Sequence, residues 1–222
     1  LAKVRKLFGT VFVDEAHGCA ASAFSKVIDS FCAENRFGLT ATEKRKDKLD
    51  FITEQILGPV ITEASVESLI PRVVIIPTGI APKYNYRTWN AAMQFLANNA
   101  DRNKLILQWI KKDLKDGRKI VIPVTYKKQV QELVESVRKM GYTAEAFVGG
   151  MNRESLLARA RAGEIDVVVG IRSIIAKGIN VKIWSAIYTI APISNPPNYY
   201  QETTRICTPL VGKPEPIIRL FV

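Results

Sequence analysis

Short apolar runs alternate with segments of helical periodicity along most of this 222-residue chain. The runs RKIVIPV (118–124) and EIDVVVG (164–170) are largely apolar, as expected for strands that are covered on both faces. In residues 101–117 and 127–141 the apolar positions recur at the spacing of one helical face, and each segment ends at a glycine. Strands that alternate with helices of this length predict an α/β fold, in which helices pack on both faces of a parallel sheet.

The alternation divides the chain into two parts. Residues 1–75 predict the rear portion of one α/β domain, whereas residues 76–222 contain enough alternating elements for a complete second domain. Between them, TGIAPKYNYRTWN (78–90) is rich in turn residues and has no clear periodicity, so we expect a connector there. A chain of this length can bury one large core or two small ones.

Charge is distributed unevenly between these parts. Residues 1–75 hold ten basic and ten acidic residues, whereas residues 76–222 hold 22 basic and 11 acidic residues and so account for the whole net charge of +11. A basic half joined to a neutral half favours a polyanionic partner such as nucleic acid. The alternative is a solubility bias that is spread over solvated surfaces.

Composition excludes several classes of protein. The three cysteines form no CxxC pair and are odd in number, which favours a reducing compartment over a disulfide framework or a zinc site. With His17 as the single histidine, a histidine-based metal site or a Ser-His-Asp hydrolase is improbable unless this residue serves it. No apolar run approaches the roughly 20 residues that span a bilayer, and the start of the chain lacks a signal-peptide pattern. We therefore expect no membrane partner and a cytoplasmic location.

The sharpest motif is VFVDEAH (11–17), in which two adjacent carboxylates follow an apolar strand. In open α/β sheets, ligands bind at the edge where strands end. At such an edge, Asp14 can hold Mg²⁺ against nucleotide phosphates, and Glu15 can orient and deprotonate an attacking water. The alternative is structural, with Asp14 capping the helix that follows the strand.

Five motifs in family order resemble those of superfamily 2 helicases of the DEAD/DEAH-box type, in particular the phage and type III restriction-subunit members. They are motif II at VFVDEAH (11–17), motif III at GLTAT (38–42), motif IV at VIPVTYKKQV (121–130), motif V at VVVGIRSIIAKGINV (167–181) and motif VI at YYQETTRICTP (199–209). The resemblance implies two RecA-like helicase lobes, the first partial (1–75) and the second complete (76–222). It also implies ATP and Mg²⁺ as substrate and cofactor.

In the first part, the resemblance assigns Mg²⁺ binding to Asp14 and the role of catalytic base to Glu15. His17 would couple the ATP site to motif VI. Thr40 and Thr42 would relay between ATP and nucleic acid through their hydroxyl groups. The alternative for the two threonines is a simple turn held by local side-chain hydrogen bonds.

In the second part, the resemblance assigns nucleotide contacts to Gly178 and Asn180 of motif V, although family members often have Asp at the position of Asn180. Gln201 matches the glutamine of motif VI. Arg205 matches its first arginine, which would reach the γ-phosphate and stabilise charge during phosphoryl transfer. The alternative for Arg205 is an ordinary surface arginine.

Arg172 and Lys177 flank motif V and are the best sequence candidates for nucleic-acid contacts through phosphates. The resemblance favours DNA over RNA and a bacterial or phage-infected cell. It also implies a second partner, the N-terminal part of the first motor domain.

Two departures from the family pattern stand out. Thr208 occupies the place of the second arginine of motif VI, so that one arginine suffices, or Arg219 substitutes for it, or hydrolysis is impaired. No GxxxxGK[ST] phosphate loop occurs in the 222 residues, which predicts weak ATP binding and little hydrolysis by this chain alone.

Three interpretations follow. The first is an ATP-dependent helicase or translocase; the second is a nucleic-acid-binding module without ATP turnover; the third is an unrelated α/β domain. The ordered set of motifs disfavours the third.

Overall fold

The computed structural model describes residues 6–40, 50–65, 67–80, 88–175, 179–193 and 196–222. Contacts divide the chain into two compact units, Leu1–Val66 and Glu67–Val222, which are described separately below. Thr42, Lys177 and Gly178 lie outside the described residues.

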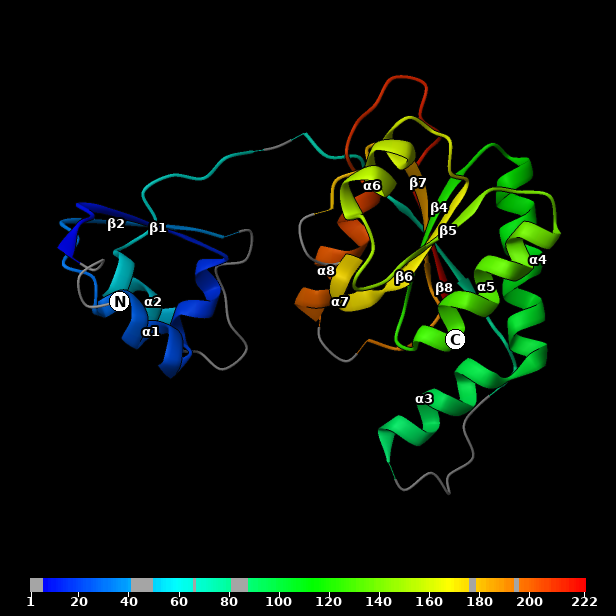
Figure 1. Cartoon of the computed structure of the whole chain (residues 1–222), viewed down its shortest axis with the longest axis horizontal. Coiled ribbons are helices and arrows are strands. Elements are labelled where there is room, and N and C mark those ends of the chain that lie inside the picture. Colours follow the sequence, from blue (N-terminus) through cyan, green and yellow to red (C-terminus); the bar gives the residue numbers. More distant parts are fainter. Residues whose placement is uncertain (1–5, 41–49, 66, 81–87, 176–178, 194–195) are drawn as a thin grey trace. The chain divides into compact units, whose positions relative to one another are not determined.

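The first unit is built around a pair of parallel strands (Figure 1). Its elements are β1 (Thr10–Asp14), the short 3₁₀ helix η2 (Ala16–Ala20), α1 (Ser22–Asp29), β2 (Asn35–Leu39) and α2 (Asp50–Leu57). One face of the pair packs against the helices, with Val13, Ala16, Cys19 and Ile28 buried at the centre. On β1 and β2, Phe12 and Phe37 stack with ring centroids 5.2 Å apart, and Phe12 is 69% exposed. Within the described residues, therefore, the apolar strand β1 is covered less completely than its sequence predicts.

The second unit contains a six-stranded, fully parallel sheet in the order β3-β8-β7-β4-β6-β5. The strands are β3 (Arg72–Ile76), β4 (Lys119–Val124), β5 (Ala144–Phe147), β6 (Val167–Ile171), β7 (Trp184–Thr189) and β8 (Ile217–Phe221). The helices are α3 (Trp89–Asn98), α4 (Ala100–Lys115), α5 (Lys127–Lys139), α6 (Arg153–Arg161), α7 (Arg172–Ile175), α8 (Pro196–Thr203) and η3 (Thr204–Ile206).

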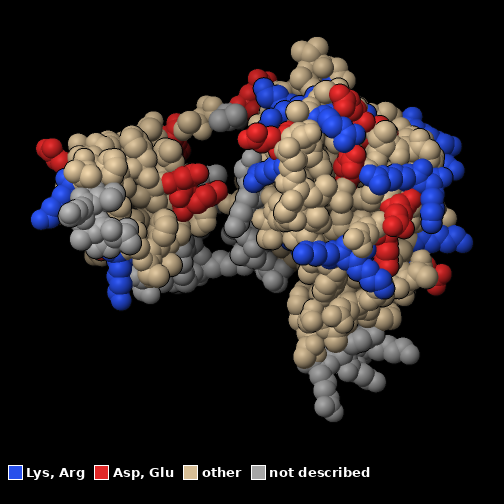
Figure 2. All heavy atoms as spheres, in the orientation of Figure 1, with Lys and Arg blue, Asp and Glu red and all other residues tan. Residues whose placement is uncertain are grey.

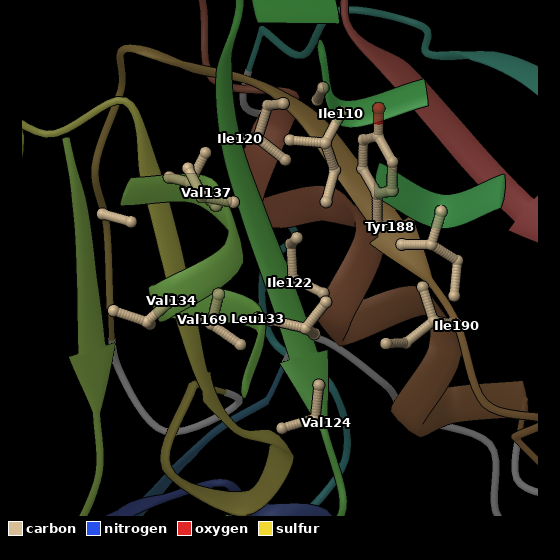
Figure 3. Close-up of a cluster of buried hydrophobic side chains, with 14 of the residues drawn as sticks. Ile110, Ile120, Ile122, Val124, Leu133, Val134, Val137, Val169, Tyr188 and Ile190 are labelled. Atoms are coloured by element: carbon tan, nitrogen blue, oxygen red, sulfur yellow. The ribbon is translucent and has the colours of Figure 1, made fainter. Parts of the chain in front are cut away.

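Helices cover both faces of this sheet. Side chains of β4 alternate between the faces, because Ile120 and Ile122 join the cluster under α4 and α5 whereas Val121 joins the cluster under α6, α7 and η3. Figure 3 shows the first cluster, in which Leu133 of α5 and Tyr188 of β7 also lie. The predicted α/β class, with a parallel sheet between two helical layers, is confirmed for this unit.

The border between the two units lies earlier than the sequence suggests. The predicted first domain ends at residue 75, inside β3, but β3 pairs with β8 from Arg72↔Ile217 to Ile76↔Phe221. Backbone hydrogen bonding therefore joins this strand to the second sheet, and contacts separate the units between Val66 and Glu67. In the part of the chain that the structure describes, no helix is long and apolar enough to cross a membrane.

Gly170 allows β6 to pack tightly at the centre of the second unit. A Cβ at this position would lie 2.7 Å from Phe147 Cβ, 2.8 Å from Phe147 O and 3.0 Å from Ile175 Cδ1. Two of these neighbours are atoms that cannot swing away, since they belong to the backbone or lie next to it. The glycine of motif V thus has a packing role as well as a place in the motif.

We predict that Gly170→Ala lowers the free energy of unfolding by about 1–3 kcal/mol, because the added methyl group overpacks the core. Urea unfolding followed by circular dichroism measures the change. Gly149→Ala is the matched control, because a Cβ at Gly149 meets nothing within 4 Å. An equal and small effect of the two substitutions would contradict the packing role.

Candidate functional site

The first group of candidate residues lies at the carboxyl ends of β1 and β2. Parallel pairing sets Asp14 opposite Leu39, so the residues that follow each strand emerge at the same edge. Motif II and motif III, 23 residues apart at His17 and Thr40, are brought together in this way.

Glu15 has an unusual backbone conformation. Its φ is 53° and its ψ is 48°, the left-handed region, and no other non-glycine residue among those described has a positive φ. This conformation costs roughly 1–2 kcal/mol for a residue with a Cβ. It ends the strand abruptly and starts η2, so that His17 lies close to the Glu15 carboxylate. Backbone strain of this kind concentrates at functional sites.

His17 contacts both neighbouring groups through one ring nitrogen. Its Nδ1 lies 3.2 Å from Glu15 Oε2 and 3.2 Å from Thr40 Oγ1. A histidine ring nitrogen that carries a hydrogen can donate it to either of these oxygens. His17 therefore connects the acidic residue of motif II to the hydroxyl of motif III.

Tight packing beneath this group fixes η2 against the sheet. A Cβ at Gly38 would lie 2.6 Å from Leu57 Cδ1 and 2.8 Å from Ala16 Cβ, so only glycine fits under η2 and α2 without a shift. Ala16 and Cys19 of η2 are buried in the same place. The glycine of motif III thus helps to position the segment that carries His17.

Asp14 offers a carboxylate to a cation. Its Oδ1 accepts the backbone N–H of Glu15 at 2.9 Å, which orients the side chain, and the residue is exposed. Among the described residues, no group of three or more His, Cys, Asp or Glu side chains could hold a metal ion by itself. Mg²⁺ is commonly bound by one or two carboxylates together with substrate phosphates and water. One oriented carboxylate fits that mode of binding.

The second group of candidate residues lies in the second unit, around η3. Arg205 is half-buried there, and its NH1 donates to the carbonyl oxygen of Ile179 at 3.4 Å. Asn180, which follows Ile179 in the sequence, is exposed, and its carbonyl oxygen accepts a hydrogen bond from Arg161 Nε at 3.3 Å. Gln201 precedes η3 on α8 and is half-buried. The segments of motifs V and VI therefore lie in contact in the fold.

An open groove of about 430 Å³ lies beside Asn180. It is lined by two cations, an amide and two apolar side chains: Arg161, Lys182, Asn180, Ile183 and Leu210.

Arg172 forms an ion pair that its sequence position does not reveal. Its Nε lies 2.9 Å from Glu202 Oε2, and its NH2 donates to the carbonyl oxygen of Ala191 at 3.3 Å. Glu202, which follows Gln201 on α8, is only 1% exposed. Burial raises the pKa of Glu202 to about 7, although the Arg172 guanidinium acts in the opposite direction. Arg172 thus ties the start of α7 to α8.

Lys213, like Glu202, is a residue of this region that the sequence does not single out. Its Nζ donates to the carbonyl oxygens of Ile206 at 2.7 Å and Thr208 at 2.9 Å. These carbonyls follow Arg205, so the ammonium group holds the end of η3. Burial lowers the pKa of Lys213 to about 8.

Arg219 cannot substitute for the missing second arginine of motif VI, so that suggestion from the sequence is wrong. Arg219 is 5% exposed on β8 and donates through Nε and NH2 to the fully buried Asp113 of α4. Tyr188 donates to the same carboxylate at 2.6 Å. Since Ile217 and Phe221 of β8 join the cluster under α4 and α5, Arg219 points to the face opposite η3.

The raised pKa of Glu202 predicts a stability that depends on pH. Between its ordinary value of 4.5 and about 7, the folded state keeps a proton that the unfolded state releases, so the free energy of unfolding falls as pH rises. In Glu202→Gln this dependence should be absent, and the stability of the wild type relative to the variant should fall by about 3 kcal/mol between pH 4.5 and 8. Urea unfolding at several pH values measures it. A difference that is constant with pH would contradict the prediction.

Comparison with known proteins identifies the second unit. The family described as "Helicase conserved C-terminal domain" matches residues 101–207, which run from α4 to the end of η3 and include Arg172, Asn180, Gln201 and Arg205. The matched stretch therefore contains every described candidate residue of the second unit.

Two curated relatives are viral proteins named as helicases. Probable helicase D10 of Escherichia phage T5 is 25% identical over 220 residues, which cover 96% of this chain and 48% of that protein. Putative helicase 161L of Invertebrate iridescent virus 6 is 32% identical over 139 residues, which cover 60% of this chain and 30% of that protein. The chain thus spans about half the length of the first relative and less of the second.

A solved structure agrees in fold. The fragment of a putative HsdR subunit of a type I restriction enzyme from Vibrio vulnificus YJ016 matches with a TM-score of 0.73 at 15% identity, over 98% of this chain and 44% of that one. The family match, the relatives and the parallel sheet between two helical layers agree. Through residues 101–207, the second unit is therefore similar to the C-terminal lobe of superfamily 2 helicases.

Proposed function

We propose that this chain is part of an ATP-dependent helicase or translocase that couples nucleoside triphosphate hydrolysis to movement on nucleic acid. The observation that carries the proposal is the contact of His17 with both Glu15 and Thr40 at the carboxyl edge of β1 and β2. A structural turn would not require a strained acidic residue at this place, whereas a hydrolytic site uses an oriented carboxylate.

In this proposal Asp14 binds Mg²⁺, which neutralises phosphate charge during transfer when it is bound. The Glu15 carboxylate accepts the proton of the attacking water. His17 orients that carboxylate through Nδ1 and also contacts Thr40. A movement of Thr40 on nucleic-acid binding would therefore move His17 and, with it, the Glu15 carboxylate. Thr42 has the parallel relay role that the resemblance implies.

Arg205 supplies positive charge to the transferred phosphoryl group, and Gln201 and Asn180 help to bind the nucleotide. Two contacts support this assignment. Arg205 donates to the carbonyl oxygen of Ile179, the residue before Asn180, and Arg161 and Lys182 lie beside Asn180. Gly178 belongs to the same proposed nucleotide contact by resemblance.

Arg172 has a coupling role in this proposal. It begins α7 directly after β6 and holds the helix that leads to Arg205 through Glu202. A nucleic-acid phosphate that contacts Arg172 would change the strength of its ion pair with Glu202. That change would move α8 and, with it, Arg205 of motif VI. We favour DNA over RNA because the motif resemblance is to phage and restriction-type members, which would act in the cytoplasm of a bacterial or phage-infected cell.

A second candidate function is a nucleic-acid-binding module without ATP turnover. It is favoured by Thr208 in the place of the second arginine of motif VI, together with the burial of Arg219 against Asp113 on the opposite face of the sheet. In this alternative the lobe keeps its basic charge and its fold but does not promote phosphoryl transfer.

Phosphate release, measured with and without a 30-nucleotide deoxythymidine oligomer in the longest protein that the gene encodes, tests the proposal. We expect Glu15→Gln to abolish turnover while nucleotide binding is retained, and Arg205→Ala to lower kcat by about 10³-fold or more. Arg159→Ala is the matched control, since Arg159 pairs with Glu145 and Glu164 on the surface.

The outcomes separate the two candidates. Turnover that survives Glu15→Gln would overturn the assigned base. Oligomer binding by a wild-type protein that releases no phosphate would favour the binding module.

A further inference from the structure

One face of α4 carries a row of lysines. Lys104, Lys111, Lys112 and Lys115, called the α4 lysine stripe below, are all exposed. At 100° per residue these positions fall within about a third of the helix circumference, and they share that face with the neutral Gln108 and with one exposed acidic residue of the first turn, Asp101. The acidic residue of the helix interior, Asp113, points inward and is fully buried.

None of the four lysines lies within 4 Å of an acidic side chain in the described part of the chain, whereas several cations of α5 and α6 do. On α5, Lys128 lies 3.6 Å from Glu132, and Arg138 lies 3.0 Å from Glu145. On α6, Arg159 lies 2.9 Å from Glu145. Those cations are neutralised locally, whereas the positive charge of α4 is left to face solvent.

Helix electrostatics accounts for only part of the stripe. Lys112 and Lys115 lie in the last turn, where cations interact favourably with the helix dipole. Lys104 lies near the start of α4, where the dipole disfavours a cation, and Lys111 repels Lys115 four residues on. The helix therefore tolerates a repulsive arrangement that its own stability does not require.

The stripe is held on a rigid support. Ile106 and Ile110 of α4 are fully buried, and Arg102 donates to the carbonyl oxygen of Ile190 at 2.6 Å. Lys112 lies over the ring of Trp109, with Nζ 4.7 Å from its centroid. Figure 2 shows Lys and Arg side chains along the side of this unit where α4 runs in Figure 1. A fixed row of cations needs little further ordering when a polyanion binds.

We propose that the α4 lysine stripe is a second nucleic-acid contact surface, which binds backbone phosphates outside the helicase motifs. The inference rests on the proposed function in that it takes nucleic acid as the partner. Lys104 and Lys115 are separated by roughly 16 Å along the helix axis, which spans several phosphates of one strand. The stripe belongs to the face under α4 and α5, opposite the face that carries Arg205. It therefore holds the polymer independently of the nucleotide-binding residues.

Salt dependence of binding tests the proposal. Affinity of the 222-residue chain for a fluorescent 30-nucleotide deoxythymidine oligomer is measured between 50 and 200 mM salt, in wild type and in K104Q/K111Q/K115Q. Three lost phosphate contacts should reduce the slope of log affinity against log salt by about 2 and weaken binding at least tenfold at low salt. Gln keeps the helix propensity of Lys.

The control variant K128Q/R138Q/R159Q removes the same net charge from paired cations of α5 and α6. It should lower the slope by much less. Equal slopes in the two variants would mean that only total charge matters, and would overturn the proposal that the α4 lysine stripe binds the polymer. Binding of the oligomer by the wild type would still be consistent with the proposed function. A wild type that does not bind the oligomer would count against both.

Lysine acetylation of the wild-type chain gives a test that does not depend on the folding of a variant. With the oligomer bound, Lys104, Lys111 and Lys115 should be protected from acetic anhydride, whereas Lys128 should stay reactive. Unchanged reactivity of the stripe, or equal protection by polyglutamate, would overturn the proposal.

Discussion

The central strands β4, β6 and β7 of the second unit are buried on both faces, and this burial excludes ionisable side chains from most of their length. Functional groups must then lie beyond the strand ends or on the covering helices. Arg172 follows β6 directly, and Arg205 lies on the short helix that follows α8. The same constraint acts in the first unit, where Asp14 is the last residue of β1 and Thr40 follows β2. The candidate residues lie at the sheet edge, because the sheet interior has no room for charge.

Where charges do enter the interior, each is tied to a partner from a distant part of the chain. Asp113 joins α4 to β8 and β7 through Arg219 and Tyr188. Glu202 joins α8 to α7 through Arg172. Removing one partner of such a pair leaves an uncompensated buried charge, which is strongly destabilising. The two pairs lie on opposite sides of the sheet, so each helical layer has its own electrostatic attachment.

Sequence patterns predict the α/β class and a division into two parts, because periodicity and strand ends are local properties. Partner choice is not local. Nothing near Arg172 in the sequence indicates Glu202, whose burial depends on how α8 packs, and the same reason explains why Arg219 is wrongly suggested as a second motif VI arginine. The border after residue 75 misses the pairing of β3 with β8, since a strand signal does not state which sheet it joins. The left-handed backbone of Glu15 has no sequence signal, because glycine or asparagine is the usual residue there.

That conformation has an evolutionary consequence. Glycine or asparagine at position 15 would relieve the backbone strain and leave a more stable protein without the carboxylate that we propose as the base. Selection for thermal tolerance alone would favour those replacements. If Glu15 is the base that we propose, an acidic residue kept at this position in relatives is a marker of turnover, and its replacement by glycine or asparagine is a marker of turnover that has been lost.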